Sequence, residues 1–374
     1  MEEGIYEGVF EVVDSKENYI VLKEKRNILV YNQFSLKSGD IIEAKIEISK
    51  FKEKRYSSDF DRTSYYASKR IYNQGKIISF KSIGHKVSTL SIRQKILEYY
   101  QTNLKEKSYA YVKACFFGIV ELEEEVQEAY SSLFISHILT ISGVHILFLF
   151  HIFNFLFQKI FKKEGSVFSI GILFGYIWFI GFPVSAIRAF LFLVLSYFNR
   201  FGIVKYTKLD IWSISFLIII LINPYLFYQM SFILSFIISF ILIFKDEFNC
   251  FRIKFMKSFF VSMLCIFSIL PFIIQMNHQF SLLGILLSFI FSFILGKYLL
   301  PFIFIILVFP VSTYEYVFII LDRILISLNQ IFFVCKVPSL PTIFILIYYF
   351  LFIFLLLTLA SKQYKIKYFV MFFS

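Results

Sequence analysis

The feature that most constrains this chain is a set of long apolar runs without a charged side chain. Residues 211–244, 258–296 and 337–361 contain no Asp, Glu, Lys or Arg. A membrane-spanning helix needs about 20 mostly apolar residues, and each run is longer than that. The core of a water-soluble domain does not need such runs. The sequence therefore predicts a polytopic α-helical membrane protein.

The apolar residues belong to one part of the chain. Residues 1–132 are rich in Lys, Glu, Tyr and Asp, whereas residues 133–374 are almost continuous Ile, Leu and Phe. This break separates a water-facing part from a lipid-facing part. By span length, the second part holds about eight to nine membrane segments. Their expected centres lie near residues 147, 174, 192, 217, 237, 267, 289, 307 and 350.

Two further features refine this membrane prediction. Prolines such as Pro271 and Pro301 are expected at breaks or kinks, and residues 324–334 are too short for a full span and suit a half-helix or a re-entrant piece. The formal net charge of +12 suits nucleic acid or anionic lipid. It is explained equally by the excess of Lys and Arg in cytoplasmic loops.

The N-terminal region has the pattern of a small β-barrel. Runs rich in β-branched and aromatic residues alternate with turn residues, and they occupy residues 4–13, 18–25, 27–34, 40–49 and 74–80. About five short strands suit a barrel of the OB kind. We therefore divide the chain into an OB-like domain (1–88), an amphipathic helical linker (89–132) and a polytopic membrane domain (133–374).

Cations and aromatic residues alternate in the segment that interrupts the strands. Cations can bind the phosphates of a single DNA strand while aromatic rings stack on its bases. The candidate DNA-binding residues are Lys52, Arg55, Tyr56, Tyr65 and Tyr66. The alternative is a solvated loop whose rings pack on the barrel.

A cluster of polar residues begins the membrane domain. His137 and His145 are eight residues apart and are expected on roughly one helix face. Ser142 and Gly143 lie between them, and Gly143 permits a kink or a close helix contact. Polar groups in hydrocarbon are costly, so such a face can line a pore. Alternatively, both histidines bond to carbonyls of neighbouring helices.

Three other polar residues lie within apolar segments. Arg188 is the only charge between Glu164 and Arg200. At membrane depth it needs water, a partner or an anion such as phosphate, unless it extends to the interface. Asn223 and Gln229 add amides to a second segment. All three are candidate pore-lining residues.

Several motifs are missing from the sequence. It has no G-x-x-x-x-G-K-[ST] motif, no H-x-H-x-D-H motif and no H-E-x-x-H motif, and no carboxylate lies deep in the predicted spans. We therefore expect no ATPase motor, no catalytic residues, no bound metal and no cofactor. The chain is not expected to be an enzyme.

Residues 116–150 resemble the signature of the ComEC-type competence proteins. The core reads His-Ile-Leu-Thr-Ile-Ser-Gly-Val-His over residues 137–145. Four further segments are similar in the same order: FDRTSYYASKRIYNQGKI, PVSAIRAFLF, NPYLFYQMSFILSF and LPFIIQMNHQFSLLGILLSFIFSFILGKYLLP. The resemblance covers most of residues 55–301, although Ser231 stands where the family has Gly.

The resemblance implies a multi-pass protein of the bacterial cytoplasmic membrane that conducts single-stranded transforming DNA. It implies DNA, membrane lipid, a DNA receptor and a separate cytoplasmic ATPase as partners, and it leaves a homo-oligomer open. Family members commonly carry membrane helices before the OB-like domain and a metallo-β-lactamase-like domain after the spans. Neither is visible here, so the sequence resembles a form without that last domain. The alternatives are a transporter for a small anion or lipid, and a truncated, non-functional relic.

Overall fold

The computed structural model of the chain describes residues 3–15, 19–24, 26–31, 36–52, 61–86, 89–200, 205–246, 254–277, 279–280, 282–331, 335–338, 340–341, 343–356 and 358. The chain forms two compact units. The first comprises Met1–Asn103, Gly175–Phe182 and Ile218–Phe232, and the second comprises Leu104–Phe174, Pro183–Leu217 and Ile233–Ser374.

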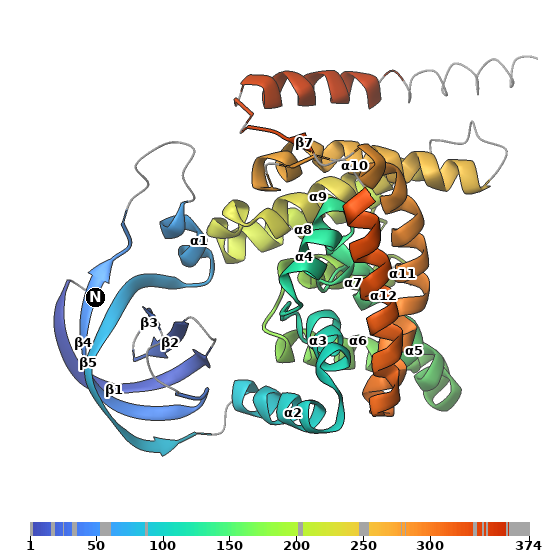
Figure 1. The fold of residues 1–374 in the computed structure, drawn as a ribbon. Helices are drawn as coiled ribbons and strands as arrows, with labels where there is room; N and C mark the ends of the chain where they lie inside the picture. Colours follow the sequence, from blue (N-terminus) through green and yellow to red (C-terminus); the bar gives the residue numbers. More distant parts are fainter. Residues whose placement is uncertain are drawn as a thin grey trace, which may run out of the picture. The chain divides into compact units, whose positions relative to one another are not determined.

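Five strands of the first unit close into a barrel, shown in blue in Figure 1. They are β1 (Gly4–Ser15), β2 (Tyr19–Lys23), β3 (Asn27–Tyr31), β4 (Asp40–Lys50) and β5 (Ile71–His85). Their order around the barrel is β1-β2-β3-β5-β4, in which β3 and β5 are parallel and the other pairs are antiparallel. The predicted five-stranded N-terminal barrel is confirmed.

The barrel closes around side chains that alternate along each strand. In β4, Ile42, Ala44, Ile46 and Ile48 are buried, whereas the residues between them are exposed or half-buried. Successive side chains of a strand point to opposite faces, so this pattern places one face in the core. Gly75 of β5 lies against that core, because a Cβ atom there would be 2.8 Å from Ile46 Cγ2. A larger residue at this position would crowd the barrel.

Helices complete the two units. In the first unit, α1 (Arg62–Ser68) separates β4 from β5, and α2 (Thr89–Asn103) follows the barrel. In the second unit, α3 (Glu106–Phe117) ends at Gly118, whose φ of 68° is left-handed and suits glycine. The helix α4 (Glu124–Ser132) follows. Most of the predicted helical linker, residues 89–132, is helical.

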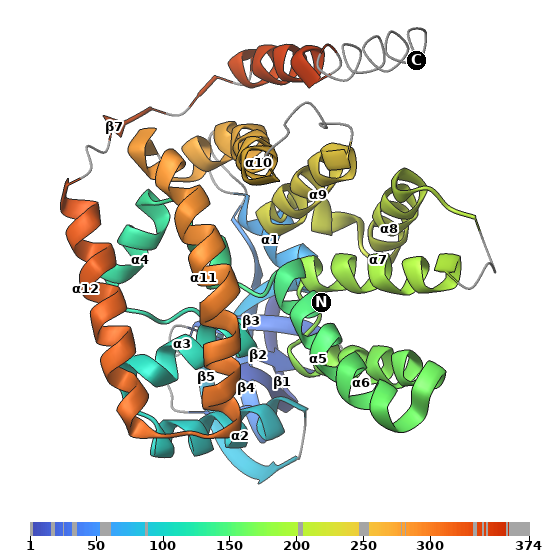
Figure 2. The same cartoon turned by 90° about the vertical axis from the view of Figure 1, so that its right-hand side faces the viewer.

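The rest of the chain is helical as well. Its elements are η1 (Ser136–Ile138), α5 (Gly143–Phe161), η2 (Lys162–Glu164), α6 (Gly165–Phe179), α7 (Val184–Arg200), α8 (Lys208–Ile222), η3 (Pro224–Tyr228), α9 (Met230–Ile243), η4 (Phe244–Asp246), α10 (Lys254–Asn277), α11 (Leu282–Val308), η5 (Ser312–Tyr314), α12 (Glu315–Ile331), a helix over 343–356, and the paired strands β6 (Gln279–Phe280) and β7 (Cys335–Lys336). Within the second unit, α12 packs against α3 and α4, and α5 packs against α7 (Figure 2).

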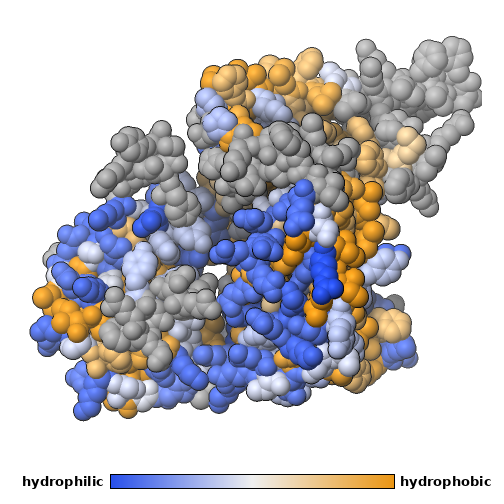
Figure 3. Space-filling view, viewed as in Figure 1, coloured by the Kyte–Doolittle hydropathy of each residue, from blue (hydrophilic) through white to orange (hydrophobic). Residues whose placement is uncertain are grey.

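Three described helical segments are long and apolar enough to cross a membrane: Ser136–Phe161, which comprises η1 and α5, Met256–Gln275 within α10, and Leu287–Val308 within α11. Shorter apolar helices cover Gly165–Phe179, Met230–Ile243 and Ile343–Leu356. The surface of the helical part is consistent with contact to lipid. Hydrophobic side chains gather over α10 and the outer side of α11 and α12, whereas the visible face of the barrel is mostly hydrophilic (Figure 3). The chain is a membrane protein with an N-terminal barrel, and the count of eight to nine segments is not confirmed.

Two predicted segments differ from the structure. The centres expected near residues 289 and 307 lie in one helix, α11, which continues through Pro301. A proline removes one backbone hydrogen bond and bends a helix, but neighbouring packing can keep the helix continuous. Residues 324–331 belong to the full helix α12 rather than to a short re-entrant piece.

Candidate functional site

The N-terminus of α5 is built by Ser142 and His145. Ser142 is the N-cap, and the two side chains form a reciprocal capping box with the backbone. The backbone N–H of Ser142 donates to His145 Nδ1 at 3.3 Å, and Ser142 Oγ lies 3.0 Å from the same nitrogen. Because a backbone N–H only donates, Nδ1 is the accepting nitrogen, and the proton of the neutral ring is on Nε2.

His145 therefore carries a buried donor. The residue is 2% exposed, and Nε2 has no hydrogen-bond partner among the described residues. A buried donor without a partner is unfavourable by roughly 1–3 kcal/mol. Such atoms are rare in native proteins, and each one points to strain, to water or to a bound group.

Arg188 lies beside this helix terminus. It belongs to the second turn of α7, which begins directly after Pro183. Its Nε donates to Ser235 Oγ of α9 at 2.7 Å. A Cβ atom built on Gly143 would lie 3.3 Å from one Arg188 terminal nitrogen, so a larger residue there would require the guanidinium to move back by a few tenths of an ångström. Among the described residues, no carboxylate forms an ion pair with Arg188.

His137 does not share a helix face with His145, so that expectation is wrong. His137 lies in η1, and residues 139–142 are not helical, because Ser142 starts a new helix. His137 Nε2 is 3.4 Å from Ser292 Oγ of α11. Protein atoms surround His137 on most sides, yet its side chain is exposed. All five residues of this cluster belong to the second unit: His137, Ser142, Gly143, His145 and Arg188.

Asn223 and Gln229 belong to the first unit. Asn223 caps η3 by accepting from the N–H of Tyr225. Its amide donates to the carbonyl of Ser68 at 2.8 Å, and the Gln229 amide donates to Ser68 Oγ at 2.7 Å. Both amides thus bind the C-terminal end of α1, which gives them a structural role that the pore-lining prediction did not include.

A buried polar network joins α12 to α3 and α4. Asp322 Oδ2 accepts from Lys107 Nζ at 2.9 Å, and Asp322 Oδ1 accepts from the Tyr111 hydroxyl at 2.6 Å. Lys107 also donates to Glu123 at 2.7 Å. The Tyr111 and Tyr130 hydroxyls are 3.2 Å apart. Asp322 is 3% exposed, so the bonds to its carboxylate lie in the interior, whereas the bond from Lys107 to Glu123 is at the surface.

Glu315 extends the same network to the start of α3. Its carboxylate accepts from the N–H groups of Lys107 and Ser108 at 3.0 and 2.8 Å and from Ser108 Oγ at 2.9 Å. The N-cap of α3 is Lys105, which has no acceptor to offer. A carboxylate from α12 therefore caps α3. This network was not predicted from the sequence, in which its available signal is the seven-residue spacing that puts Glu315 and Asp322 on one face of a helix.

The surroundings change the acidity of these groups. Burial raises the pKa of the Tyr111 hydroxyl well above its usual range, and Tyr130 and Asp322 raise it further. Burial also raises the Tyr130 pKa. For Lys107, burial works to lower the pKa, but the hydrogen bonds to Glu123 and Asp322 outweigh it, so the pKa is raised. At physiological pH Lys107 is therefore a cation, and Tyr111 and Tyr130 are neutral.

Some of the DNA-binding residues predicted on the barrel have structural roles. The Tyr66 ring stacks on Phe51 with centroids 4.9 Å apart, and it packs against the buried cluster around Leu29. The Tyr65 ring has Lys69 Nζ 4.4 Å above it. Lys52 is exposed. For Tyr66 the alternative of a ring packed on the barrel is the one observed.

Arg55 and Tyr56 lie outside the described residues. In the described part of the chain, no group of three or more His, Cys, Asp or Glu side chains is arranged to hold a metal ion.

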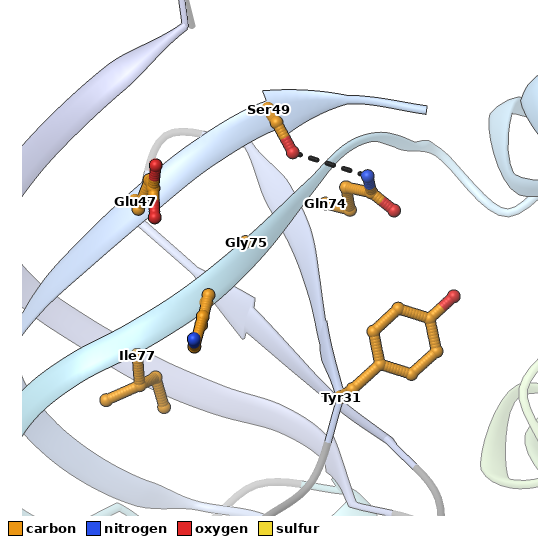
Figure 4. Close-up of a pocket in the computed structure, with 7 residues that line it drawn as sticks. Tyr31, Glu47, Ser49, Gln74, Gly75 and Ile77 are labelled. Atoms are coloured by element: carbon orange, nitrogen blue, oxygen red, sulfur yellow. Dashed lines mark hydrogen bonds between the residues drawn. The ribbon is translucent and has the colours of Figure 1, made fainter. Parts of the chain in front are cut away.

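The barrel surface carries a hollow of about 420 Å³ where β3, β4 and β5 meet. It is lined by Tyr31, Glu47, Ser49, Gln74, Gly75, Lys76 and Ile77. Figure 4 shows the ring of Tyr31 and the amide of Gln74 on the same side of β5. The Gln74 amide nitrogen donates to Ser49 Oγ at 3.3 Å and to the Lys50 carbonyl at 3.2 Å, so the orientation of the amide is fixed.

Comparison with known proteins places the helical part of the chain in a family. A family model described as "Competence protein" matches residues 118–362. The chain belongs to the competence protein family. It is also 25% identical over 230 residues to ComE operon protein 3 of Bacillus subtilis (strain 168), a match that covers 59% of this chain and 29% of that protein. The chain thus matches less than a third of the relative's length. No solved structure matches the chain.

The competence family match includes one of the two polar clusters in full. His137, Ser142, Gly143, His145 and Arg188 all fall within residues 118–362. Of the buried network, Glu315, Asp322, Glu123 and Tyr130 fall within the match, whereas Lys107 and Tyr111 precede it. The barrel lies outside the match, so its role has to be argued from its own residues.

Proposed function

We propose that this chain conducts a single DNA strand across the bacterial cytoplasmic membrane during DNA uptake, as a channel and not as an enzyme. The observation that carries the proposal is the cluster at the α5 N-terminus. Arg188, without a described carboxylate partner, lies against Gly143, and a buried donor on His145 lacks a partner. The competence family supports the proposal, because its name refers to the uptake of DNA.

The physical problem of such a channel is the charge of the polymer. A phosphate in apolar surroundings is unfavourable by many kcal/mol unless it is solvated or paired. The path must therefore be wet and lined with donors or cations. His137 fits a wet wall, since its side chain is exposed although protein surrounds it. Arg188 fits a phosphate, since a guanidinium binds phosphate oxygens with two parallel hydrogen bonds.

The helix terminus adds to this attraction. The first N–H groups of a helix carry about half a positive charge and bind anions. The capping box binds the N–H groups of Ser142 and His145, and those of Gly143 and Val144, as the first residues of the helix, have no acceptor within it. A passing phosphate would meet these groups together with Arg188. An external ATPase and a DNA receptor are the expected partners in this proposal, because the sequence has no P-loop of its own.

The test is DNA uptake by a strain in which this chain is the only copy. Arg188→Leu should abolish entry of labelled DNA, whereas Arg188→Lys should retain part of it. Arg200→Leu is the matched control, because Arg200 is an exposed arginine at the end of the same helix. Membrane content of each variant is measured in parallel. Normal uptake by an expressed Arg188→Leu protein would contradict the proposal.

A transporter for a small anion is the second candidate, favoured by the same unpaired Arg188. Proteoliposomes containing the chain distinguish the two functions. A DNA channel should show no Arg188-dependent flux of phosphate or sulfate, whereas a small-anion transporter should carry one of them in the absence of DNA.

A further inference from the structure

We propose that the hollow on the barrel binds one nucleotide of a single DNA strand, with the base stacked on Tyr31. This inference rests on the proposed function, because the channel supplies the strand. It assigns the nucleotide site to Tyr31, Ser49, Gln74 and Lys76 rather than to the aromatic residues of α1.

The first argument is the state of the aromatic rings. Tyr66 stacks on Phe51 and packs against the barrel cluster, so one face of its ring is occupied and the residue is half-buried. Tyr31 ends β3, is 50% exposed and lines the hollow. An exposed ring fixed at the end of a strand can stack on any base, because every base has a π-face.

The second argument is the size of the hollow. Its volume of about 420 Å³ lies in the range of small-molecule sites, which is about 300–1,000 Å³. A single nucleotide is a ligand of that class. A duplex keeps its bases stacked and paired, and it therefore cannot place one base against Tyr31 without unpairing it. The hollow thus suits single-stranded DNA.

The third argument is the hydrogen-bonding character of the wall. The Gln74 amide nitrogen is bound to Ser49 and to the Lys50 carbonyl, which leaves Gln74 Oε1 as the group offered to a ligand. The Glu47 carboxylate is a second acceptor that lines the hollow. Acceptors bind the exocyclic amino groups of cytosine or adenine, and thymine has no such group. The wall should therefore favour cytosine over thymine.

The fourth argument is charge. Lys76 lines the same hollow and is exposed. Its ammonium group can therefore pair with a phosphate at the rim of the hollow while the base lies inside the hollow. Neither Lys76 nor Glu47 forms an ion pair with another residue in the described ranges. One cation outside and two acceptors inside match the polarity of a nucleotide, whose phosphate is negative and whose base edge donates.

The experiment measures binding of fluorescent dC12 and dT12 to the full chain in lipid nanodiscs by anisotropy. The unmodified chain should bind dC12 more tightly than dT12, and either more tightly than duplex. Tyr31→Ala should weaken dC12 binding by about five- to 150-fold, the range found for removal of a stacked base. Gln74→Leu should remove the preference for dC12 over dT12. Lys76→Gln should lower the salt slope by about 0.7.

The matched control is Tyr99→Ala, because Tyr99 is an equally exposed tyrosine of the same unit outside the hollow. It should bind dC12 normally. If Tyr31→Ala binds dC12 and dT12 as the unmodified chain does, the nucleotide site is wrong, even where Arg188→Leu abolishes uptake. If Tyr31→Ala loses binding while Arg188→Leu leaves uptake normal, the site is supported and the channel function is refuted.

Discussion

The ion pair between Lys107 and Asp322 gives the sharpest test of how the helical unit is held together. Lys107→Met would leave the Asp322 carboxylate, 4% exposed at its side chain, with the Tyr111 hydroxyl as its remaining described partner. Removing one partner of a buried pair typically costs about 3–5 kcal/mol, because the other charge stays buried. At about 2–4 °C per kcal/mol, the Tm should fall by about 6–20 °C.

A second substitution separates charge from packing. In Lys107→Met with Asp322→Leu, no charge is left buried, and replacing a buried pair by apolar residues is often close to neutral. The double variant should therefore be more stable than Lys107→Met alone. The Tyr111 hydroxyl keeps Tyr130 as a partner in this variant.

The assay is thermal unfolding of the full chain in detergent micelles, followed by circular dichroism. Lys95→Met is the matched control, since Lys95 is an exposed lysine of α2 for which the described part of the chain shows no ion pair. Its Tm should not change. Asp322→Leu alone is measured as well. If the fall in Tm of the double variant equals the sum of the falls in Lys107→Met and Asp322→Leu, the two side chains do not couple α3 to α12 and the reasoning fails.

Three further predictions concern other contacts. Glu315→Gln should lower stability by about 0.5–2 kcal/mol, the typical loss for an N-cap, and an unchanged Tm would refute its capping role. Folding holds the Tyr111 pKa above the value of 10.0 expected in the unfolded chain. The contribution of the neutral Tyr111 hydroxyl to stability is therefore intact below pH 10 and is lost at higher pH. In Tyr111→Phe, the free energy of unfolding should fall less steeply above pH 10. Gly75→Val should cost about 1–3 kcal/mol, because its Cβ crowds Ile46, whereas Gly84→Val, with nothing within 4 Å, should not.

The barrel was predictable because its strands carry a local signal. The alternation from Ile42 to Ile48 has a period of two, and that period is written in the sequence. The strand order was not predictable, because pairing β3 with β5 depends on residues far apart in the chain. The packing of Tyr66 on the barrel and the exposure of Tyr31 also depend on tertiary contacts, which a local sequence pattern does not contain.

The helical unit shows the same limit. The break between His137 and His145 had a local signal, because a serine before an apolar run is a typical N-cap. The continuity of α11 through Pro301 had none, since only packing decides whether a proline bends or ends a helix. The contact of Lys107 with Asp322 joins residues 215 positions apart, and a single sequence does not reveal that partner.

The electrostatics of the α5 N-terminus connect the fold to the proposed channel. A helix N-terminus carries partial positive charge, and Arg188 is held beside it by Ser235, a neutral partner. Two positive groups side by side repel each other, and Gly143 leaves room for the guanidinium, which a Cβ atom at 3.3 Å would crowd. The fold thus maintains an arrangement that is unfavourable when empty and becomes favourable when an anion enters. In the proposed channel, a phosphodiester chain would present one such anion after another, so the same arrangement would release each phosphate as the next one arrives.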